Sequence, residues 1–429
     1  MKTKKILFTL KNYFLGMLCR HRADYHADRK SYKKAIKNYT RAIRAKKTDD
    51  TLYSARGCSY LDAGKPIKAL VDFNKAIALN PADAALYSNR GDAYAELGKY
   101  EKAFKDYNRA IKMDATLACA YSNRGQAYND TGDMQAALKD LTHAIALDPT
   151  EPTAHINRGW TYFELEKIEK AEKDFEQALK LEPDSADARG SLAQIYQIMD
   201  KPDKAIEQFT NIIKHEPDSG FAYNNRGLLY QEKGDLEKAF DDFIKALKLS
   251  PYESNVYHNL GLLFMRLEGE AKTAIEAFTD ALKLDPNNGL TLSNRGDAYL
   301  HLDKPKQALK DFNKAIGLDP ERGLYYCGRG MAYYMLGDLQ EALQDFSQAM
   351  KLEPQSPELF CNRALVYSEL ENYTAALADY SAAIKLDPKC AYAYFNRGAI
   401  YQDMGRYPLA KADTAKAYKL DPEITKDVE

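Results

Sequence analysis

Sulfur and metal chemistry have little support in this sequence. Its 429 residues include six cysteines, seven histidines and one tryptophan, and they contain neither a Cys-x-x-Cys pair nor a His-Glu-x-x-His motif. Six scattered cysteines are too few for a disulfide scaffold, and without those motifs a zinc ribbon or a helix-borne zinc site is excluded. We therefore expect no metal and no cofactor.

Long apolar runs and an excess of one charge are also missing. The composition, 45% apolar and 29% charged, is typical of a folded soluble protein and excludes a disordered tail or a multi-span membrane protein. The formal net charge of -1 conceals an asymmetry, because residues 1–49 contribute +12 and the rest of the chain -13. Attraction to phosphate or lipid is therefore expected only at the N-terminus, and we expect no nucleic-acid partner.

The chain repeats itself with a period of 34 residues, broken by one 35-residue step. A small residue marks the period, and we number it position 8 of each unit. Eleven units then span residues 50–424, and the extra residue falls near residues 268–270, in an expected loop. The marker residues are Gly57, Gly91, Gly125, Gly159, Ala193, Gly227, Gly261, Gly296, Gly330, Ala364 and Gly398.

Other positions recur in phase with this marker. Position 11 is Tyr or Phe, position 20 is Ala, and position 24 is usually Phe or Tyr. Ten units have a Pro two residues before their last residue. The apolar positions 4, 8 and 11 share one helical face, as do 20, 24 and 27, so each unit is expected to form two amphipathic helices. Small residues at positions 8 and 20 let the two backbones approach closely. One such hairpin cannot bury its apolar face alone, so the units must stack.

The spacing resembles the tetratricopeptide repeat (TPR) over residues 50–424. The resemblance implies an all-α fold, a right-handed superhelical solenoid of stacked antiparallel helix pairs. Residues 16–49 resemble a degenerate further repeat, since Tyr32, Ala35 and Tyr39 hold positions 17, 20 and 24, and we expect it to cap the stack. Residues 1–15 are a basic amphipathic N-terminal segment, and residues 425–429 are a short C-terminal tail.

Position 7 departs from the family pattern, which has Leu there. Nine units have Arg at position 7, and the same nine have Asp at position 23; the units with Leu192 and Leu260 carry Gln208 and Ala277 instead. The shared absences predict a pair within each hairpin, because Arg donates two parallel hydrogen bonds to a carboxylate. The alternative interpretation is a solvated pair that adds little stability. The nine arginines are Arg56, Arg90, Arg124, Arg158, Arg226, Arg295, Arg329, Arg363 and Arg397.

Positions 2, 6, 9 and 13 lie on the opposite face of the first helix, which in this family lines a concave groove. Position 6 is Asn in eight units, and an amide that both donates and accepts can hold the main chain of an extended peptide. The row resembles the asparagine ladder of the O-GlcNAc transferase repeats, which favours peptide binding; the alternative is that Asn merely tolerates exposure. The predicted peptide-binding residues are Asn89, Asn123, Asn157, Asn225, Asn259, Asn294, Asn362 and Asn396.

Two further features of the groove face have competing interpretations. Position 13 is acidic in seven units, which indicates either a preference for basic ligands or a solvated face. Cys327 and Cys361 hold position 5 of adjacent units, so they are candidate neighbours in the groove, with a redox role as the less favoured hypothesis.

Residues 1–20 can form a basic amphipathic helix with Ile6, Leu10 and Phe14 on one side. Its apolar stretch is too short and too interrupted to cross a bilayer. Three interpretations stay open: a cap on the first repeat, contact with a membrane surface, or an export signal, although no small-residue cleavage site follows.

The predicted function is a non-catalytic, cytoplasmic scaffold that binds an extended segment of a protein partner in its groove. Too few residues lie outside the repeats for a catalytic domain, and neither a phosphate loop nor a nucleophile motif occurs, so we predict no enzyme activity. The alternative is a membrane-surface-tethered assembly factor or adaptor that uses the basic N-terminal helix, and is then a peripheral membrane protein.

Overall fold

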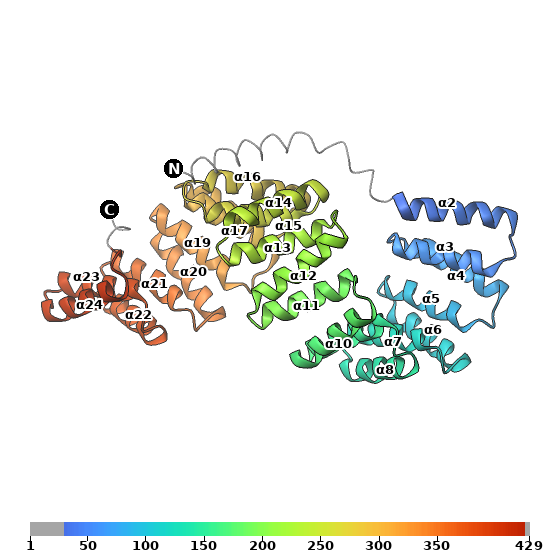
Figure 1. Ribbon diagram of the computed structural model, residues 1–429. Helices are drawn as coiled ribbons and strands as arrows, with labels where there is room; N and C mark the ends of the chain where they lie inside the picture. The colour runs from blue at the N-terminus through green and yellow to red at the C-terminus, as the bar shows by residue number, and fades with distance from the viewer. Residues whose placement is uncertain (1–29, 425–429) are drawn as a thin grey trace. The chain divides into compact units, whose positions relative to one another are not determined.

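A computed structural model describes residues 30–424, and in this range the chain consists of α-helices and turns without a β-strand (Figure 1). The predictions for residues 1–15, 1–20 and 425–429 lie outside the described residues, and the capping repeat 16–49 is described from Lys30 onward. Contacts divide the chain into two compact units, the first ending at Pro251 and the second beginning at Tyr252.

The first unit contains α2, which belongs to the degenerate repeat predicted to be a cap, and the first six helix pairs. Each pair is one 34-residue repeat, and its two helices pack on each other and on the next pair. The helices are α2 (Lys30–Ala45), α3 (Asp50–Asp62), α4 (Pro66–Leu79), α5 (Ala84–Ala95), α6 (Tyr100–Met113), α7 (Ala118–Asp130), α8 (Met134–Leu147), α9 (Pro152–Glu164), α10 (Ile168–Leu181), α11 (Ala186–Ile198), α12 (Pro202–His215), α13 (Gly220–Glu232) and α14 (Leu236–Leu249).

The second unit contains the last five pairs, stacked in the same way. Within each unit the structure confirms the predicted all-α stack of antiparallel helix pairs. The helices are α15 (Ser254–Met265), α16 (Ala271–Leu284), α17 (Gly289–Leu300), α18 (Pro305–Leu318), α19 (Gly323–Leu336), α20 (Leu339–Leu352), α21 (Pro357–Glu369), α22 (Tyr373–Leu386), α23 (Ala391–Asp403) and α24 (Tyr407–Leu420).

The turn inside every hairpin contains one residue in the left-handed region of backbone conformation, at position 15 in ten repeats and one residue later, at Gly269, in the seventh repeat with its extra residue. Seven of these residues are glycines, such as Gly98 with a φ of 68°. In the other four repeats Glu or Asp adopts the same conformation, with φ between 53° and 57°. The extra residue of the seventh repeat falls in the turn between α15 and α16, as predicted. The turn geometry is therefore common to all eleven repeats even where glycine is absent.

The small residue at position 8 lies directly against the large residue at position 24. A Cβ atom added to Gly91 would lie 2.5 Å from a ring carbon of Tyr107, and one added to Gly57 would lie 2.6 Å from Phe73. Both rings are fully buried, as are the alanines at position 20, such as Ala103. The predicted close approach of the two helices is confirmed at these glycines, because no side chain fits between the backbone and the ring.

The nine Arg–Asp pairs form within their hairpins, as predicted. In each pair the arginine Nε and Nη2 donate to the two carboxylate oxygens over 2.6 to 2.9 Å. The nine aspartates are only 3 to 8% exposed, so the pairs are not the solvated surface pairs of the alternative interpretation. The hydrogen bond to Asp72 raises the pKa of Arg56, and the other eight arginines behave alike.

Each of these arginines also contacts the preceding repeat, a contact that the repeat pattern did not predict. Its Nη1 donates to a hydroxyl or amide oxygen sixteen residues earlier in the chain, as Arg226 does to Thr210 over 3.1 Å. The acceptors are Thr40, Asn74, Asn108, Thr142, Thr210, Thr279, Asn313, Ser347 and Ser381. One guanidinium therefore joins the two helices of its own repeat and also joins that repeat to the previous one.

Candidate functional site

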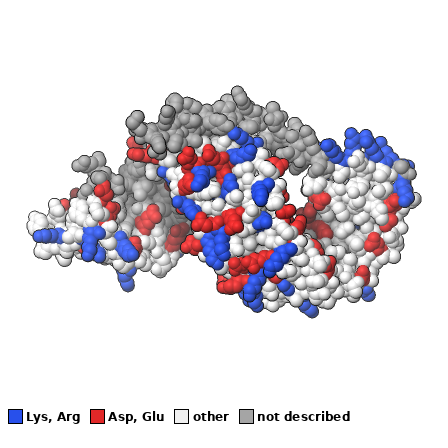
Figure 2. Space-filling view, viewed as in Figure 1, with Lys and Arg blue, Asp and Glu red and all other residues white. Residues whose placement is uncertain are grey.

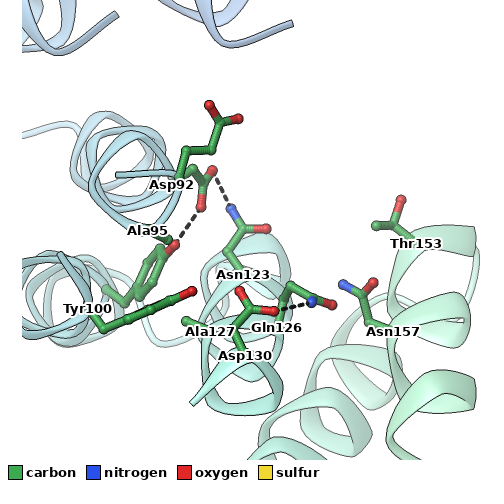
Figure 3. A pocket seen from close by; sticks show the side chains of 11 residues that line it. Asp92, Ala95, Tyr100, Asn123, Gln126, Ala127, Asp130, Thr153 and Asn157 are labelled. Carbon is green, nitrogen blue, oxygen red and sulfur yellow. Dashed lines mark hydrogen bonds between the residues drawn. The ribbon is translucent and has the colours of Figure 1, made fainter. Parts of the chain in front are cut away.

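A hollow of about 600 Å³ opens on the first helices of three consecutive repeats in the first unit (Figure 3). Its lining comes from α5, α7 and α9 and from two tyrosines of α6. Seven lining residues hold positions 2, 6, 9 and 13, the predicted groove positions. They are Thr153 at position 2, Asn123 and Asn157 at 6, Asp92 and Gln126 at 9, and Glu96 and Asp130 at 13, joined by Ala95, Tyr100, Tyr107 and Ala127.

Asp92 is a desolvated carboxyl group at this hollow. It accepts hydrogen bonds from the Tyr107 hydroxyl and from the Asn123 amide, each over 2.8 Å (Figure 3). Burial raises the pKa of Asp92 to about 7; the Tyr107 hydrogen bond opposes this rise and the charge of Glu96 adds to it. Burial, followed by the charge of Asp92, raises the pKa of Tyr107. Asp92 therefore changes its charge near neutral pH.

Carboxylates surround Asp92, while none of the residues that line the hollow is Lys, Arg or His. Asp130 accepts a hydrogen bond from Gln126 over 2.9 Å. Burial raises the pKa of Glu96, and the charge of Asp62 adds to the rise. A cationic group placed here would favour the ionised form of all three carboxyl groups of the lining.

Three of the eight predicted asparagines donate to the preceding repeat. Asn123 reaches Asp92, Asn89 reaches the Ser54 hydroxyl over 3.5 Å, and Asn362 reaches the Cys327 sulfur over 3.5 Å. Their acceptors hold position 5 or 9 of the neighbouring first helix. At these repeats the amide helps to join adjacent helices.

The remaining five asparagines differ among themselves. Asn225 and Asn396 donate to backbone carbonyls of their own helices over 2.8 and 2.9 Å. Asn259 is 6% exposed and has a partner. The side chains of Asn157 and Asn294 make no hydrogen bond to any other described residue, and both are half-buried. Their amides are available to a ligand without breaking an existing bond.

A related arrangement occurs in the second unit, where Asp297 of α17 holds position 9. Burial raises the pKa of Asp297 to about 6, and the charge of Glu358 adds to the rise. Burial also raises the pKa of the nearby Cys327 thiol to about 12. Asp92 and Asp297 are the two aspartates at position 9 among the eleven repeats. This rarity was the sequence signal that could have identified them.

Family profiles match nearly all of residues 59–424. A profile described as TPR repeat matches residues 59–98, 91–132, 125–165, 330–371 and 366–405. Profiles described as tetratricopeptide repeat match residues 152–185, 175–207, 221–253, 254–288, 290–322 and 391–424. The chain belongs to the tetratricopeptide repeat family. TPR proteins generally act as non-catalytic scaffolds that bind protein partners.

Solved structures with similar TPR folds include the Cut9–Hcn1 hetero-tetramer of the APC/C, at 15% identity and a TM-score of 0.50, with 92% of this chain and 91% of that chain covered. MamA is similar at 27% identity and a TM-score of 0.33, over 38% of this chain and 94% of that chain. A tetratricopeptide repeat protein from Parabacteroides merdae is similar at 23% identity and a TM-score of 0.44, over 61% and 99%. No curated protein matches the sequence.

The described part of this TPR chain has neither a cluster of metal ligands nor a helix that could span a membrane. Residues 30–424 contain no group of three or more His, Cys, Asp or Glu side chains placed to hold a metal ion. None of the helices in that range is long and apolar enough to span a membrane.

Proposed function

We propose that this TPR protein is a non-catalytic scaffold whose groove binds an extended segment of a partner protein. The observation that carries the proposal is the hollow on α5, α7 and α9, where positions 2, 6, 9 and 13 converge. The half-buried amide of Asn157 lies at this hollow with both its donor and its acceptor unused. An extended peptide main chain supplies the complementary carbonyl and amide groups.

The charge at the hollow favours a basic side chain in the bound segment. Asp92, Glu96 and Asp130 lie along its wall, and Tyr100 adds an aromatic surface. A lysine or arginine would pair with the carboxylates and stack on the ring. Of the two interpretations of the acidic position 13, these carboxylates therefore support the one that predicts a basic ligand.

Binding of short synthetic peptides tests this function. The panel shares one extended neutral sequence whose central residue is Arg, Lys, norleucine or Glu, and fluorescence anisotropy gives each Kd. We expect the Arg and Lys peptides to bind at least about tenfold more tightly than the Glu peptide. Asn157→Ala should weaken every peptide, whereas Asp92→Asn combined with Asp130→Asn should weaken only the basic ones.

Asp184→Asn is the matched control, because Asp184 is an exposed carboxylate of the same unit that lies away from the hollow. It should leave every Kd unchanged. Failure of all four peptides to bind contradicts groove binding. Binding without preference for the central residue retains the groove but contradicts the basic pocket.

A second candidate function is attachment to an anionic membrane surface, and the charge of α2 favours it. Lys33, Lys34, Lys37, Arg41 and Arg44 are all exposed on this helix, and Figure 2 shows blue side chains gathered where α2 lies. Residues 30–48 contain no Asp or Glu, and the first acidic residue after them is Asp49. Such a surface is attracted to anionic lipids by about 1 kcal/mol per basic residue.

Co-sedimentation with lipid vesicles tests the attachment. The full chain should bind vesicles that contain phosphatidylserine but not pure phosphatidylcholine vesicles, and high salt should release it. Replacing Lys33, Lys34 and Lys37 by Gln leaves residues 1–20 intact and should weaken binding. Binding that is equal on both vesicles or insensitive to salt contradicts this function. We also propose a cytoplasmic location, because six scattered cysteines do not provide the dense disulfide framework of a small secreted domain.

A further inference from the structure

Two cysteines of the second unit lie in contact where the tenth and eleventh repeats meet. Cys361 belongs to α21 and Cys390 is the N-cap residue of α23, and their sulfur atoms are 4.0 Å apart. Cys361 is only 3% exposed and belongs to a buried apolar cluster with Ala364, Tyr380 and Ala393, whereas Cys390 is half-buried. Cys327, the neighbour expected for Cys361 from the repeat positions, instead accepts a hydrogen bond from Asn362.

The two thiols have different electrostatic surroundings. The hydrogen bond with Cys361 lowers the pKa of Cys390, and the backbone amides of Ala393 and Tyr392 at the start of α23 lower it further, while burial and the charge of Asp387 oppose this change. The same hydrogen bond, together with burial, raises the pKa of Cys361. Thiolates at helix N-termini are reactive, while a buried thiol beside one can act as its resolving partner.

The other described cysteines do not share this arrangement. Burial raises the pKa values of Cys58, Cys119 and Cys327. Within residues 30–424, Cys361 and Cys390 are the pair of thiols that touch each other. The chain therefore contains internal controls with ordinary thiol chemistry.

We propose that Cys361 and Cys390 form a peroxide-reactive dithiol that closes into a reversible disulfide. The Cys390 thiolate attacks one oxygen of hydrogen peroxide, the O–O bond breaks, and Cys390 becomes a sulfenic acid while the departing hydroxide takes a proton to become water. The Cys361 sulfur then attacks the Cys390 sulfur, the S–O bond breaks, and the leaving hydroxide takes the Cys361 proton as a second water. Two thiols lose two electrons in total, and one peroxide gains them.

The disulfide would tie the middle of one repeat's first helix to the start of the next repeat's first helix. Cys390 lies two residues before Tyr392, which holds position 2 of the groove face, and Tyr392 accepts the hydrogen bond from Asn396 through its carbonyl. Oxidation therefore constrains the groove face of the eleventh repeat. This inference does not depend on whether the hollow of the first unit binds a peptide.

Peptide mapping of the full chain tests the proposal. The protein is treated with one equivalent of hydrogen peroxide, the remaining thiols are alkylated, and the digest is analysed by mass spectrometry. We expect a cross-linked peptide containing Cys361 and Cys390 that has lost two hydrogen atoms and disappears on reduction with dithiothreitol. Cys390 should react at least about tenfold faster than the exposed Cys119.

Single variants separate the roles of the two thiols. Cys361→Ser should leave Cys390 as a sulfenic acid that dimedone traps, and Cys390→Ser should leave Cys361 reduced. Serine is a favoured N-cap, so the start of α23 is kept in the second variant. Cys327→Ser is the control and should not change the cross-link. Persistence of both thiols while Cys119 is oxidised, or a cross-link between Cys327 and Cys361, would overturn the proposal.

Discussion

Single arginines stabilise this protein by forming three hydrogen bonds each, two within their own repeat and one to the preceding repeat. Arg226 donates two bonds to Asp242 and a third to Thr210, and the Tyr223 and Tyr230 rings lie within 5.6 and 5.8 Å of its guanidinium carbon. Arginine suits this place because its planar fork matches a carboxylate and keeps a further N–H for another acceptor. Lysine offers one point charge and cannot do both.

Arg226→Leu should destabilise the first unit by about 3 to 5 kcal/mol, because it leaves the buried Asp242 carboxylate without its cation. Adding Asp242→Ala should restore part of the loss, since the double variant reproduces the Leu and Ala of the seventh repeat, Leu260 and Ala277. Urea unfolding followed by the fluorescence of Trp160, the one tryptophan of the chain, measures both.

Alanine is a better second substitution than glutamine for a structural reason. In the fifth repeat Gln208 accepts a hydrogen bond from Arg189 at position 4, a residue that the sixth repeat replaces by Tyr223. Glutamine at 242 would therefore lack a donor. If the double variant with alanine is no more stable than Arg226→Leu alone, the leucine itself and not the lost pairing causes the damage.

Asp92 should make the stability of the first unit depend on pH. The pKa of Asp92 is about 7 in the folded chain and near 4 in the unfolded chain. Its contribution to the free energy of unfolding is therefore fully present below about pH 4 and is lost as the pH rises to about 7. Asp92→Asn removes this loss. Between about pH 4 and 7, the free energy of unfolding of the variant should therefore increase relative to that of the natural protein by up to about 1.4 kcal/mol per pH unit. Urea melts between pH 4 and 8 measure the difference. A difference that is independent of pH contradicts the raised pKa.

Helix pairs in this fold depend on the turn between them. All eleven turns use one left-handed residue, but four repeats place Glu or Asp there, at Glu166, Asp200, Asp303 and Glu371. A side chain in this conformation costs about 1 to 2 kcal/mol compared with glycine. Repeats with glycine and repeats with Glu or Asp form the same turn, because the packing of the two helices stabilises its conformation.

Glu166→Gly should therefore stabilise the first unit by about 1 kcal/mol, and Gly132→Ala should destabilise it by a similar amount. Gly132 has a φ of 84° in the preceding repeat, and no atom would contact an added Cβ, so the alanine effect reports backbone strain without a clash. Urea melts of the two variants give both values. Equal stability of Glu166→Gly and the natural protein would show that the hairpin relieves the strain elsewhere.

Within each unit the repeats contact mainly their neighbours, so a local defect should stay local. In Arg226→Leu, hydrogen exchange should accelerate in α12 to α14, while α19 to α24 should keep their protection. Mass spectrometry of deuterated peptides measures each helix separately. Uniform loss of protection across the chain would contradict this and would indicate one cooperative unit.

Most of the fold could be predicted from the sequence because its determinants are local and repeated. The glycine at position 8, the ring at position 24 and the Arg–Asp pairs connect residues of one hairpin, sixteen positions apart in the chain. Nine of the eleven repeats carry the Arg–Asp pair, and the two repeats that lack both residues indicated which residues belong together.

The candidate site depended on contacts between repeats, which a repeat pattern does not define. Side chains at the same position form different hydrogen bonds. Asn123 donates to Asp92, Asn225 donates to a carbonyl of its own helix, and the side chain of Asn157 forms no hydrogen bond to another described residue. Cys361 likewise meets Cys390 and not Cys327. Which neighbour a side chain reaches depends on the distance and angle between adjacent helices, and these arise only when the packed faces close together.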